Sequence, residues 1–213
     1  MKKTIILFAL LMSTIIYSLV FAQNNSERQA YDYAETTIAY KEMLNGLRGV
    51  LYNDQCINID KIISSEREPE KDNDTHYALF DTNGDGQPEL HIRSQNHYFI
   101  ISYKNEDLYV WKDLSPYYTQ LDNGAFLHFR PGGTPPHMSY IYLIMNYSGD
   151  ETLNIYFEKY DMDANGVYDE NDKYLYEGIE VTLDEWTSLT EKYLTEKSDS
   201  IEWCVYSRGN NEL

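Results

Sequence analysis

Apolar and polar residues alternate in short runs through the middle of the chain, from His76 to Val181. The runs are rich in tyrosine, isoleucine, valine and phenylalanine and are separated by asparagine, aspartate, glycine and proline, a pattern typical of strands joined by turns. Because short connections join antiparallel neighbours, we expect a mainly antiparallel sheet. The expected strands are HYALF, ELHIRS, HYFIISYK, DLYVWKDL, GAFLHFR, HMSYIYLIMN, TLNIYFEKY and KYLYEGIEV.

Helical periodicity flanks these strands on both sides. Before them, Ser26 and Gln29 have the spacing of a capping box, and an apolar stripe follows. Its members are Ala30, Tyr33, Ala34, Ile38, Leu44, Leu47 and Leu51. After the strands, Thr182 and Glu185 repeat the capping-box spacing, ahead of an apolar stripe made of Leu183, Trp186, Leu189, Tyr193 and Leu194. With IEWCVY as a last strand, a helix near each end of the strands predicts an α+β fold.

The start of the chain has the pattern of a secretory signal peptide. Residues 1–22 begin with a short basic segment, continue as an apolar stretch, and end with Val20 and Ala22 at the −3 and −1 positions before Gln23. This predicts cleavage before Gln23 and a single exported domain over residues 23–213. The alternative is an uncleaved membrane anchor, but no basic stop-transfer segment follows the apolar stretch.

Composition and charge narrow the possible partners. Cleavage removes two lysines, which leaves 15 basic against 35 acidic residues and changes the net charge from −18 to −20. Such a surface repels nucleic acid and anionic membrane, so we expect neither as a partner. The content of 15% aromatic and 42% hydrophobic residues argues for a packed core rather than disorder.

Two cysteines, Cys56 and Cys204, lie far apart in the sequence. In an exported protein they could form one disulfide, which would tie the segment after the first helix to the last strand. The alternative is a pair of free thiols buried in the core. We expect the disulfide.

The stretch DTNGDGQPEL has the oxygen-ligand spacing of a calcium-binding loop. Positions one, three, five and nine carry side-chain oxygens, and position seven offers a backbone carbonyl; the residues are Asp81, Asn83, Asp85, Gln87 and Glu89. An EF-hand would place a bidentate glutamate at position twelve and a helix afterwards, but this chain has Ile92 and a strand. The alternative is a turn without metal, since Asn-Gly and Asp-Gly are common turn formers.

A second acidic stretch, DMDANGVYDEND, repeats this spacing. Its candidate ligands are Asp161, Asp163, Asn165, Asp169 and Asp172. Asp172 falls at position twelve, which makes this loop formally closer to an EF-hand than the first. The alternative is a plain hairpin, because Asn165 and the glycine after it form a strong two-residue turn signal. Ca²⁺ is the cofactor expected at both loops.

Three segments resemble blocks of a family of poorly characterised secreted and lipoprotein domains from Gram-positive, often gut, bacteria. YALFDTNGDGQPEL is similar to the family's YALYD-x-(N/D)GDG-x-PEL signature. NGAFLHFRPGG (123–133) and YEGIEVTLDEW (176–186) resemble two further blocks. The resemblance implies an exported α+β domain with a calcium-type loop, and the family carries no assigned reaction.

Catalytic signatures are scarce in this chain. It contains no Gly-x-Ser-x-Gly, His-Glu-x-x-His or Cys-x-x-Cys motif and no glycine-rich phosphate loop after a strand. The histidines are scattered, and the one beside a Gly/Pro-rich loop, His137, is the candidate for a pocket; the others are His76, His91, His97 and His128. Trp111, Trp186 and Trp203 could form a sugar-stacking platform but are expected in the core.

Two functions follow from these patterns. The first is a non-enzymatic exported domain, stabilised by calcium, that binds a protein or glycan at the cell surface or in the extracellular space. The second is a small secreted hydrolase with an unrecognised site. An exposed aromatic row would favour the first function, and a deep pocket with convergent acids would favour the second. We expect the binding function.

Overall fold

The computed structural model describes residues 32–63, 75–146, 148–207 and 213. The expected signal peptide over residues 1–22 and the capping box of Ser26 and Gln29 lie outside the described residues. The described residues form mainly antiparallel strands with a few helices, so the predicted α+β class is confirmed.

Seven strands form a first sheet in the order β13-β3-β4-β5-β6-β1-β2. Neighbouring strands are antiparallel except β1 and β6, which pair in parallel where Leu51 meets Tyr109. A short helix, α2 (Ile59–Ile63), follows β2. The strands are β1 (Val50–Tyr52), β2 (Gln55–Ile57), β3 (His76–Phe80), β4 (Glu89–Arg93), β5 (Tyr98–Lys104), β6 (Asp107–Leu114) and β13 (Cys204–Val205).

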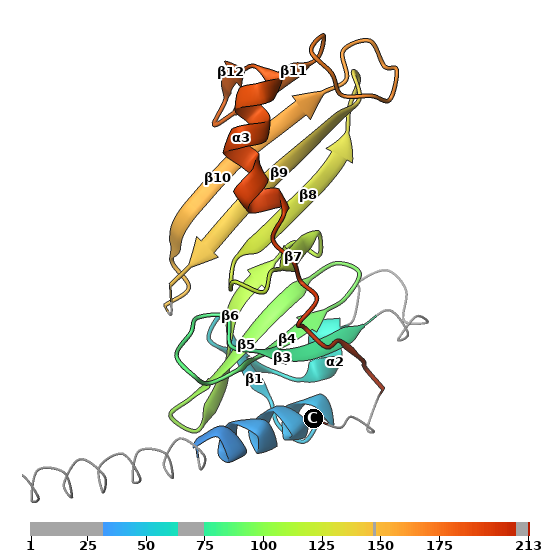
Figure 1. Cartoon of the computed structure of the whole chain (residues 1–213). Coiled ribbons are helices and arrows are strands. Elements are labelled where there is room, and N and C mark those ends of the chain that lie inside the picture. The colour runs from blue at the N-terminus through green and yellow to red at the C-terminus, as the bar shows by residue number, and fades with distance from the viewer. Residues whose placement is uncertain (1–31, 64–74, 147, 208–212) are drawn as a thin grey trace, which may run out of the picture.

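Six strands form a second, fully antiparallel sheet in the order β12-β11-β10-β9-β8-β7. They are β7 (Tyr118–Gln120), β8 (Phe126–Gly132), β9 (His137–Met145), β10 (Glu151–Tyr160), β11 (Lys173–Tyr176) and β12 (Ile179–Val181). The helix α3 (Leu183–Leu194) lies across one face of this sheet (Figure 1). The two sheets follow one another along the long axis of an elongated molecule, with the second sheet at the top of the view.

A helix over residues 32–44 packs on the first sheet with only part of the predicted stripe: Leu44 is buried as expected, but Leu51 lies in strand β1 beyond the helix. Tyr33, Ile38 and Leu47 are exposed, whereas Thr36 and Tyr40 are buried. Both buried polar groups have internal partners: the Thr36 hydroxyl donates to the carbonyl of Asp32 at 2.8 Å, and the Tyr40 hydroxyl donates to the carbonyl of Ile101 at 3.0 Å. The apolar pattern failed because these hydrogen bonds remove the cost of burying polar atoms.

The helix α3 begins as predicted. The Thr182 side chain accepts from the Glu185 backbone N–H, and the Glu185 carboxylate accepts from the Thr182 backbone N–H at 2.9 Å, so the capping box is present. Trp186 and Tyr193 are buried against Phe157 of β10 in an aromatic cluster. Leu189, which was expected in the apolar stripe, is exposed.

A third buried cluster joins the two sheets. Tyr98, Ile100 and Trp111 come from the first sheet, and Phe126 and Leu143 come from the second. The chain after α3 returns to the first sheet, where β13 pairs with β3 (Figure 1). Both the packing and the return of the chain therefore connect the sheets.

The predicted disulfide is wrong. Cys56 lies in β2 and Cys204 in β13, which are the opposite edges of the first sheet. At about 4.8 Å per strand, six steps separate them by roughly 29 Å, far beyond the Cα separation that a disulfide spans. Both thiols are free, and both cysteines are exposed, so the alternative of buried thiols is also wrong.

Candidate functional site

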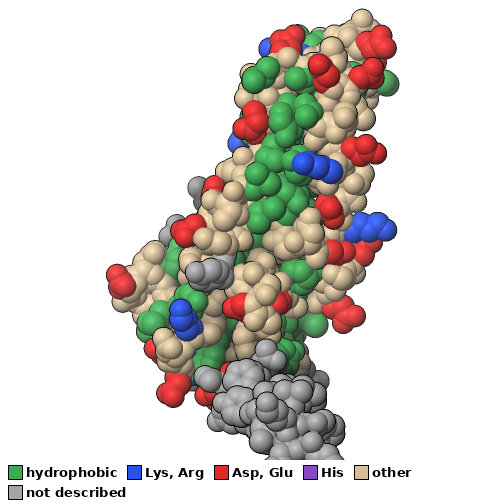
Figure 2. Space-filling view, turned by 60° about the vertical axis from the view of Figure 1, so that its left-hand side comes forward, with side chains coloured by type: hydrophobic (Ala, Val, Ile, Leu, Met, Phe, Trp, Pro, Cys, Tyr) green, Lys and Arg blue, Asp and Glu red, His purple; other side chains and the backbone are tan. Residues whose placement is uncertain are grey.

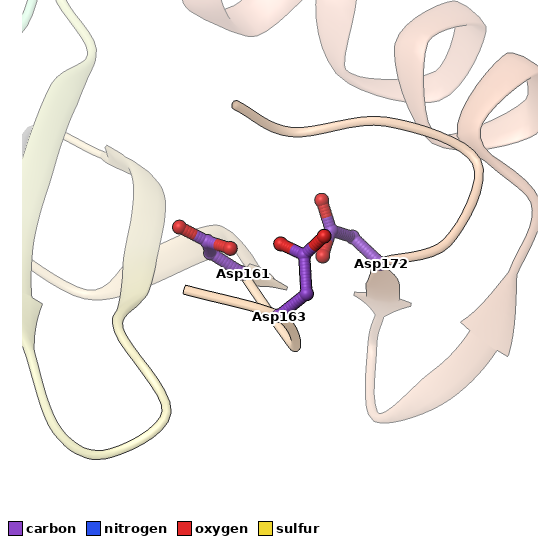
Figure 3. A group of neighbouring side chains, drawn as sticks. All are labelled: Asp161, Asp163 and Asp172. Carbon is purple, nitrogen blue, oxygen red and sulfur yellow. The ribbon is translucent and has the colours of Figure 1, made fainter. Parts of the chain in front are cut away.

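Three carboxylates converge in the loop between β10 and β11. Asp161, Asp163 and Asp172 each offer an oxygen, and these oxygens lie within 4.8 Å of one another. Figure 3 shows the three carboxylates turned toward a common space. They occupy positions one, three and twelve of the loop, and this Asp cluster could hold a metal ion.

Asp161 organises the first half of this loop. It is the last residue before the turn and is only 2% exposed. Its carboxylate oxygens accept from the backbone N–H groups of Asn165, at 3.1 Å, and Gly166, at 2.8 Å. Its own backbone N–H donates to the carbonyl of Pro136 at 2.9 Å, which ties the loop to the neighbouring β8–β9 connection. The buried carboxylate therefore has a fixed position.

Asp172 closes the loop from its other end. One carboxylate oxygen accepts from the backbone N–H of Met162 at 2.7 Å, and the other accepts from the N–H of Asp169 at 2.8 Å. Asp169 stays outside the converging group, and its carboxylate instead accepts from the N–H of Asn171 at 2.8 Å. Each bonded oxygen of Asp172 keeps a second lone pair for a cation.

The two-residue hairpin expected at Asn165 and Gly166 is not formed. A type I′ turn requires positive φ at both central residues, but the positive values are at Ala164 (+56°) and Gly166 (+82°). Asn165 instead accepts from the Val167 N–H at 2.6 Å and donates its amide to Asp163 at 2.9 Å. The whole twelve-residue segment is the connection, and Asn165 stabilises it.

No protein cation neutralises the group within the described part of the chain. The ion pairs found there join other residues, and Lys173, the next residue after the loop, pairs with Glu180 at 3.5 Å. Burial raises the pKa of the Tyr168 hydroxyl, and the charges of Asp161 and Asp172 raise it further. Three carboxylates this close repel one another, so a bound cation would lower the energy of the loop.

The first acidic loop, between β3 and β4, has a similar turn. Asp81 accepts from the N–H groups of Gly84 at 2.8 Å and Gly86 at 2.9 Å, which are positions four and six, whereas Asp161 accepts from positions five and six of its loop. Positive φ occurs at Gly84 (+74°) and Gly86 (+88°), which are again positions four and six. Asp85 accepts from the N–H of Gln87 at 2.8 Å. These hydrogen bonds and the two glycines fix the turn of this loop.

Its carboxylates, however, do not form a converging group among the described residues. Glu89 is 3% exposed and accepts from the Thr82 N–H at 2.9 Å and the Asn83 amide at 2.8 Å. Burial raises the pKa of Glu89 to about 8, against the lowering effect of the Thr82 hydrogen bond and with help from the charges of Asp85 and Asp81. The Thr82 N–H and the Asn83 amide engage both oxygens of the Glu89 carboxyl.

A second feature was not anticipated from the sequence. One face of the second sheet is covered by α3, and the opposite face carries a row of side chains across β7, β8, β9 and β10: Tyr118, His128, Ile141 and Tyr156. Next to this row is a depression of about 400 Å³ lined by Ser115, Tyr117, His128, Arg130 and Pro131. Alternation along a strand shows which residues share a face of the sheet. Only the position of α3 shows which of the two faces is left uncovered.

The other sequence candidates have structural roles. Trp111 and Trp186 are buried in two different clusters, and Trp203 packs against the first of these. His137 stacks on Tyr160 with ring centroids 5.1 Å apart and does not line the depression. Buried His91 bridges the Thr82 and Tyr98 hydroxyls at 2.9 Å each, and burial lowers its pKa to about 3.

The visible surface is acidic with an apolar band. In Figure 2, Asp and Glu outnumber Lys and Arg, and hydrophobic side chains, tyrosines included, form a band over the half built from the second sheet. Among the described residues, no helix combines the length and the hydropathy needed to cross a membrane.

No family model, curated protein or solved structure matches the chain.

Proposed function

We propose that the chain is an exported, non-enzymatic binding domain whose 161–172 loop is stabilised by Ca²⁺. The observation that carries the proposal is the convergence of Asp161, Asp163 and Asp172 within 4.8 Å. Three carboxylates provide only oxygen ligands, which suits a hard cation and disfavours zinc, whose sites are rich in nitrogen and sulfur. The irregular loop suits Ca²⁺, which accepts flexible geometry, better than Mg²⁺, which requires a tight octahedron.

The role proposed for the metal is to stabilise the end of the second sheet. The loop leads from β10 into β11, and the hydroxyl of buried Tyr174 donates to the Asp169 carbonyl at 3.0 Å. A cation that holds both ends of the loop would therefore also hold β11 in register with β10. The 81–89 loop has a similar turn, but its carboxylates do not converge among the described residues.

The binding role is supported by the open face of the second sheet, which offers exposed rings beside a depression. The lining of this depression contains no carboxylate, so it does not supply the acid pair that glycoside hydrolysis uses. Export is supported by the sequence of residues 1–22. N-terminal sequencing of protein recovered from the medium should give Gln23, and an intact Met1 would contradict export through a cleaved signal peptide.

Thermal unfolding in Ca²⁺, Mg²⁺ and EDTA tests the metal proposal. Because the metal binds the folded loop and not the open chain, stability should rise by about 1.4 kcal/mol at ten times the dissociation constant. For an extracellular site of this kind we expect a dissociation constant of about 10⁻⁴–10⁻³ M. Mg²⁺ should stabilise less than Ca²⁺. Coincident melts in Ca²⁺ and EDTA, with no heat in calorimetric titration, would contradict the proposal.

A further inference from the structure

The depression beside β8 has an unusual charge for this protein. The chain carries a net charge of −18, yet the lining contains Arg130 and no carboxylate. Within the described part of the chain, no ion pair engages the Arg130 guanidinium. Acidic side chains elsewhere on the surface repel a free anion. The Arg130 guanidinium, in contrast, attracts one to this depression. An unpaired arginine in a recess is suited to an anionic group, and its planar fork matches a carboxylate in two parallel hydrogen bonds.

Aromatic rings border this charge. Tyr117 is 67% exposed, and its ring meets His128 edge-on at a centroid distance of 6.2 Å. On the other side, His128 packs on Tyr118 at 4.8 Å. Burial and the charge of Arg130 both lower the pKa of His128, so its ring is a neutral hydrogen-bonding group at neutral pH. The exposed Tyr117 ring offers an apolar surface to a ligand.

Hydroxyl-binding groups complete the lining. The Ser115 hydroxyl oxygen accepts from the Tyr117 backbone N–H at 3.4 Å, which leaves its own proton to donate. Neither ring nitrogen of His128 has a hydrogen-bond partner among the described residues. A ligand with several hydroxyls, one apolar ring face and one carboxylate matches this combination of groups.

We propose that the depression binds a carboxylate-bearing sugar residue of a polysaccharide. Its carboxylate pairs with Arg130, its ring packs on Tyr117, and its hydroxyls bond to Ser115 and His128. The inference rests on the proposed binding function and names its ligand class. The row of Tyr118, His128, Ile141 and Tyr156 extends from the depression across the open face, which provides a path for neighbouring sugar residues.

Titration of the full exported chain with an oligosaccharide of galacturonic acid tests this inference. The matched ligand is the methyl ester of the same oligosaccharide, which keeps every ring and hydroxyl but lacks the charge. The acid should bind at least about tenfold more tightly than the ester, because a charge-assisted contact is lost. Arg130→Gln should reduce binding of the acid by a similar factor, and Tyr117→Ala should weaken both ligands.

Arg48→Gln is the control variant. Arg48 pairs with Glu42 at 3.4 Å and lies just before β1 of the first sheet, whereas Arg130 belongs to the second sheet. It should leave sugar binding unchanged. Equal binding of acid and ester, no loss in Arg130→Gln, or no binding of the acid would overturn the inference. Equally tight binding of a short peptide ending in glutamate would also overturn it, because the site would then recognise a carboxylate without a sugar.

The titrations are run in Ca²⁺ and in EDTA, since uronic acids themselves chelate calcium. Calcium-dependent stability that persists while the acid fails to bind would remove the sugar inference and leave the proposed metal role intact. Binding of the acid in EDTA with Arg130 dependence, in a protein that calcium does not stabilise, would support the inference and contradict the metal role.

Discussion

The carboxylate of Asp172 accepts a hydrogen bond from the backbone N–H of Met162 at 2.7 Å, across ten residues of a loop. This contact brings the last residue of the loop against its first turn and places Asp172 beside Asp161 and Asp163. The loop thus positions three like charges before any cation is present. Their repulsion is a cost that a bound cation would convert into stabilisation.

Asp172→Asn is expected to remove calcium-dependent stability. The amide oxygen keeps one hydrogen bond to the loop, but the variant loses the charge that attracts the cation. The wild type should gain about 1.4 kcal/mol at ten times its dissociation constant, and the variant should gain little at the same concentration. Urea unfolding with and without Ca²⁺ measures both gains.

Two control variants separate this site from general charge effects. Glu170→Gln removes an exposed acid from the same loop that lies outside the converging group, and should keep the calcium response. Asp85→Asn changes the first loop, and this variant should also keep most of the calcium-dependent gain in stability. A response lost in Asp85→Asn but kept in Asp172→Asn would move the metal to the 81–89 loop.

The spacing of acids pointed to both loops but did not tell which one brings its carboxylates together. In either loop an aspartate at position one accepts from two later N–H groups, one of them at position six. The difference lies in tertiary burial: Glu89 sits inside the first sheet, whereas Asp172 returns over its own loop. Burial of one carboxyl depends on elements far away in the sequence, and local spacing contains no information on it.

Strands and the second helix were similarly predictable, while the order of strands was not. Local patterns identified β3 to β6, β8 to β10 and the Thr182 cap, because alternation and capping are local properties. They missed the three-residue strands β1, β2 and β7, and the expected strand KYLYEGIEV is two strands, β11 and β12. The cysteine pairing failed because β2 and β13 occupy opposite edges, which depends on the sheet order. The open face of the second sheet could not be foreseen for a similar reason, since the position of α3 decides which alternating residues stay exposed.

Ala164→Gly is expected to stabilise the protein. Ala164 has φ +56°, a left-handed conformation that strains any residue with a Cβ atom. Glycine relieves this strain but adds entropy to the unfolded chain, so we expect a net gain of about 0.5–1 kcal/mol. Ala34→Gly, on the exposed face of the helix over residues 32–44, should instead destabilise by about 1 kcal/mol. Chemical denaturation measures the change in the free energy of unfolding of each variant. A loss of stability in Ala164→Gly would contradict the strain argument.

Both cysteines are expected to react as free thiols in the folded, exported protein. Cys56 and Cys204 are exposed at opposite edges of the first sheet, so neither can reach the other without unfolding. An alkylating reagent should label both under native, non-reducing conditions, and the intact mass should be two labels heavier. A monomer that takes no label until it has been reduced would contradict the sheet order described above.

The stability of the protein should fall as pH rises from about 4.5 to about 8, because of Glu89. Burial raises the pKa of this carboxyl from 4.5 to about 8 in the folded state, so the folded chain holds a proton that the unfolded chain has released. Stability therefore decreases with pH over this window and is constant, for this group, above it. Glu89→Gln imitates the protonated acid and should remove this part of the pH dependence, so that the variant is more stable than the wild type at pH 9 and similar to it at pH 4. Urea unfolding between pH 4 and 9 measures both profiles, with Glu170→Gln as the exposed-acid control. Parallel profiles of wild type and Glu89→Gln would show that Glu89 titrates alike in the folded and unfolded chains, and its burial would then carry no electrostatic cost.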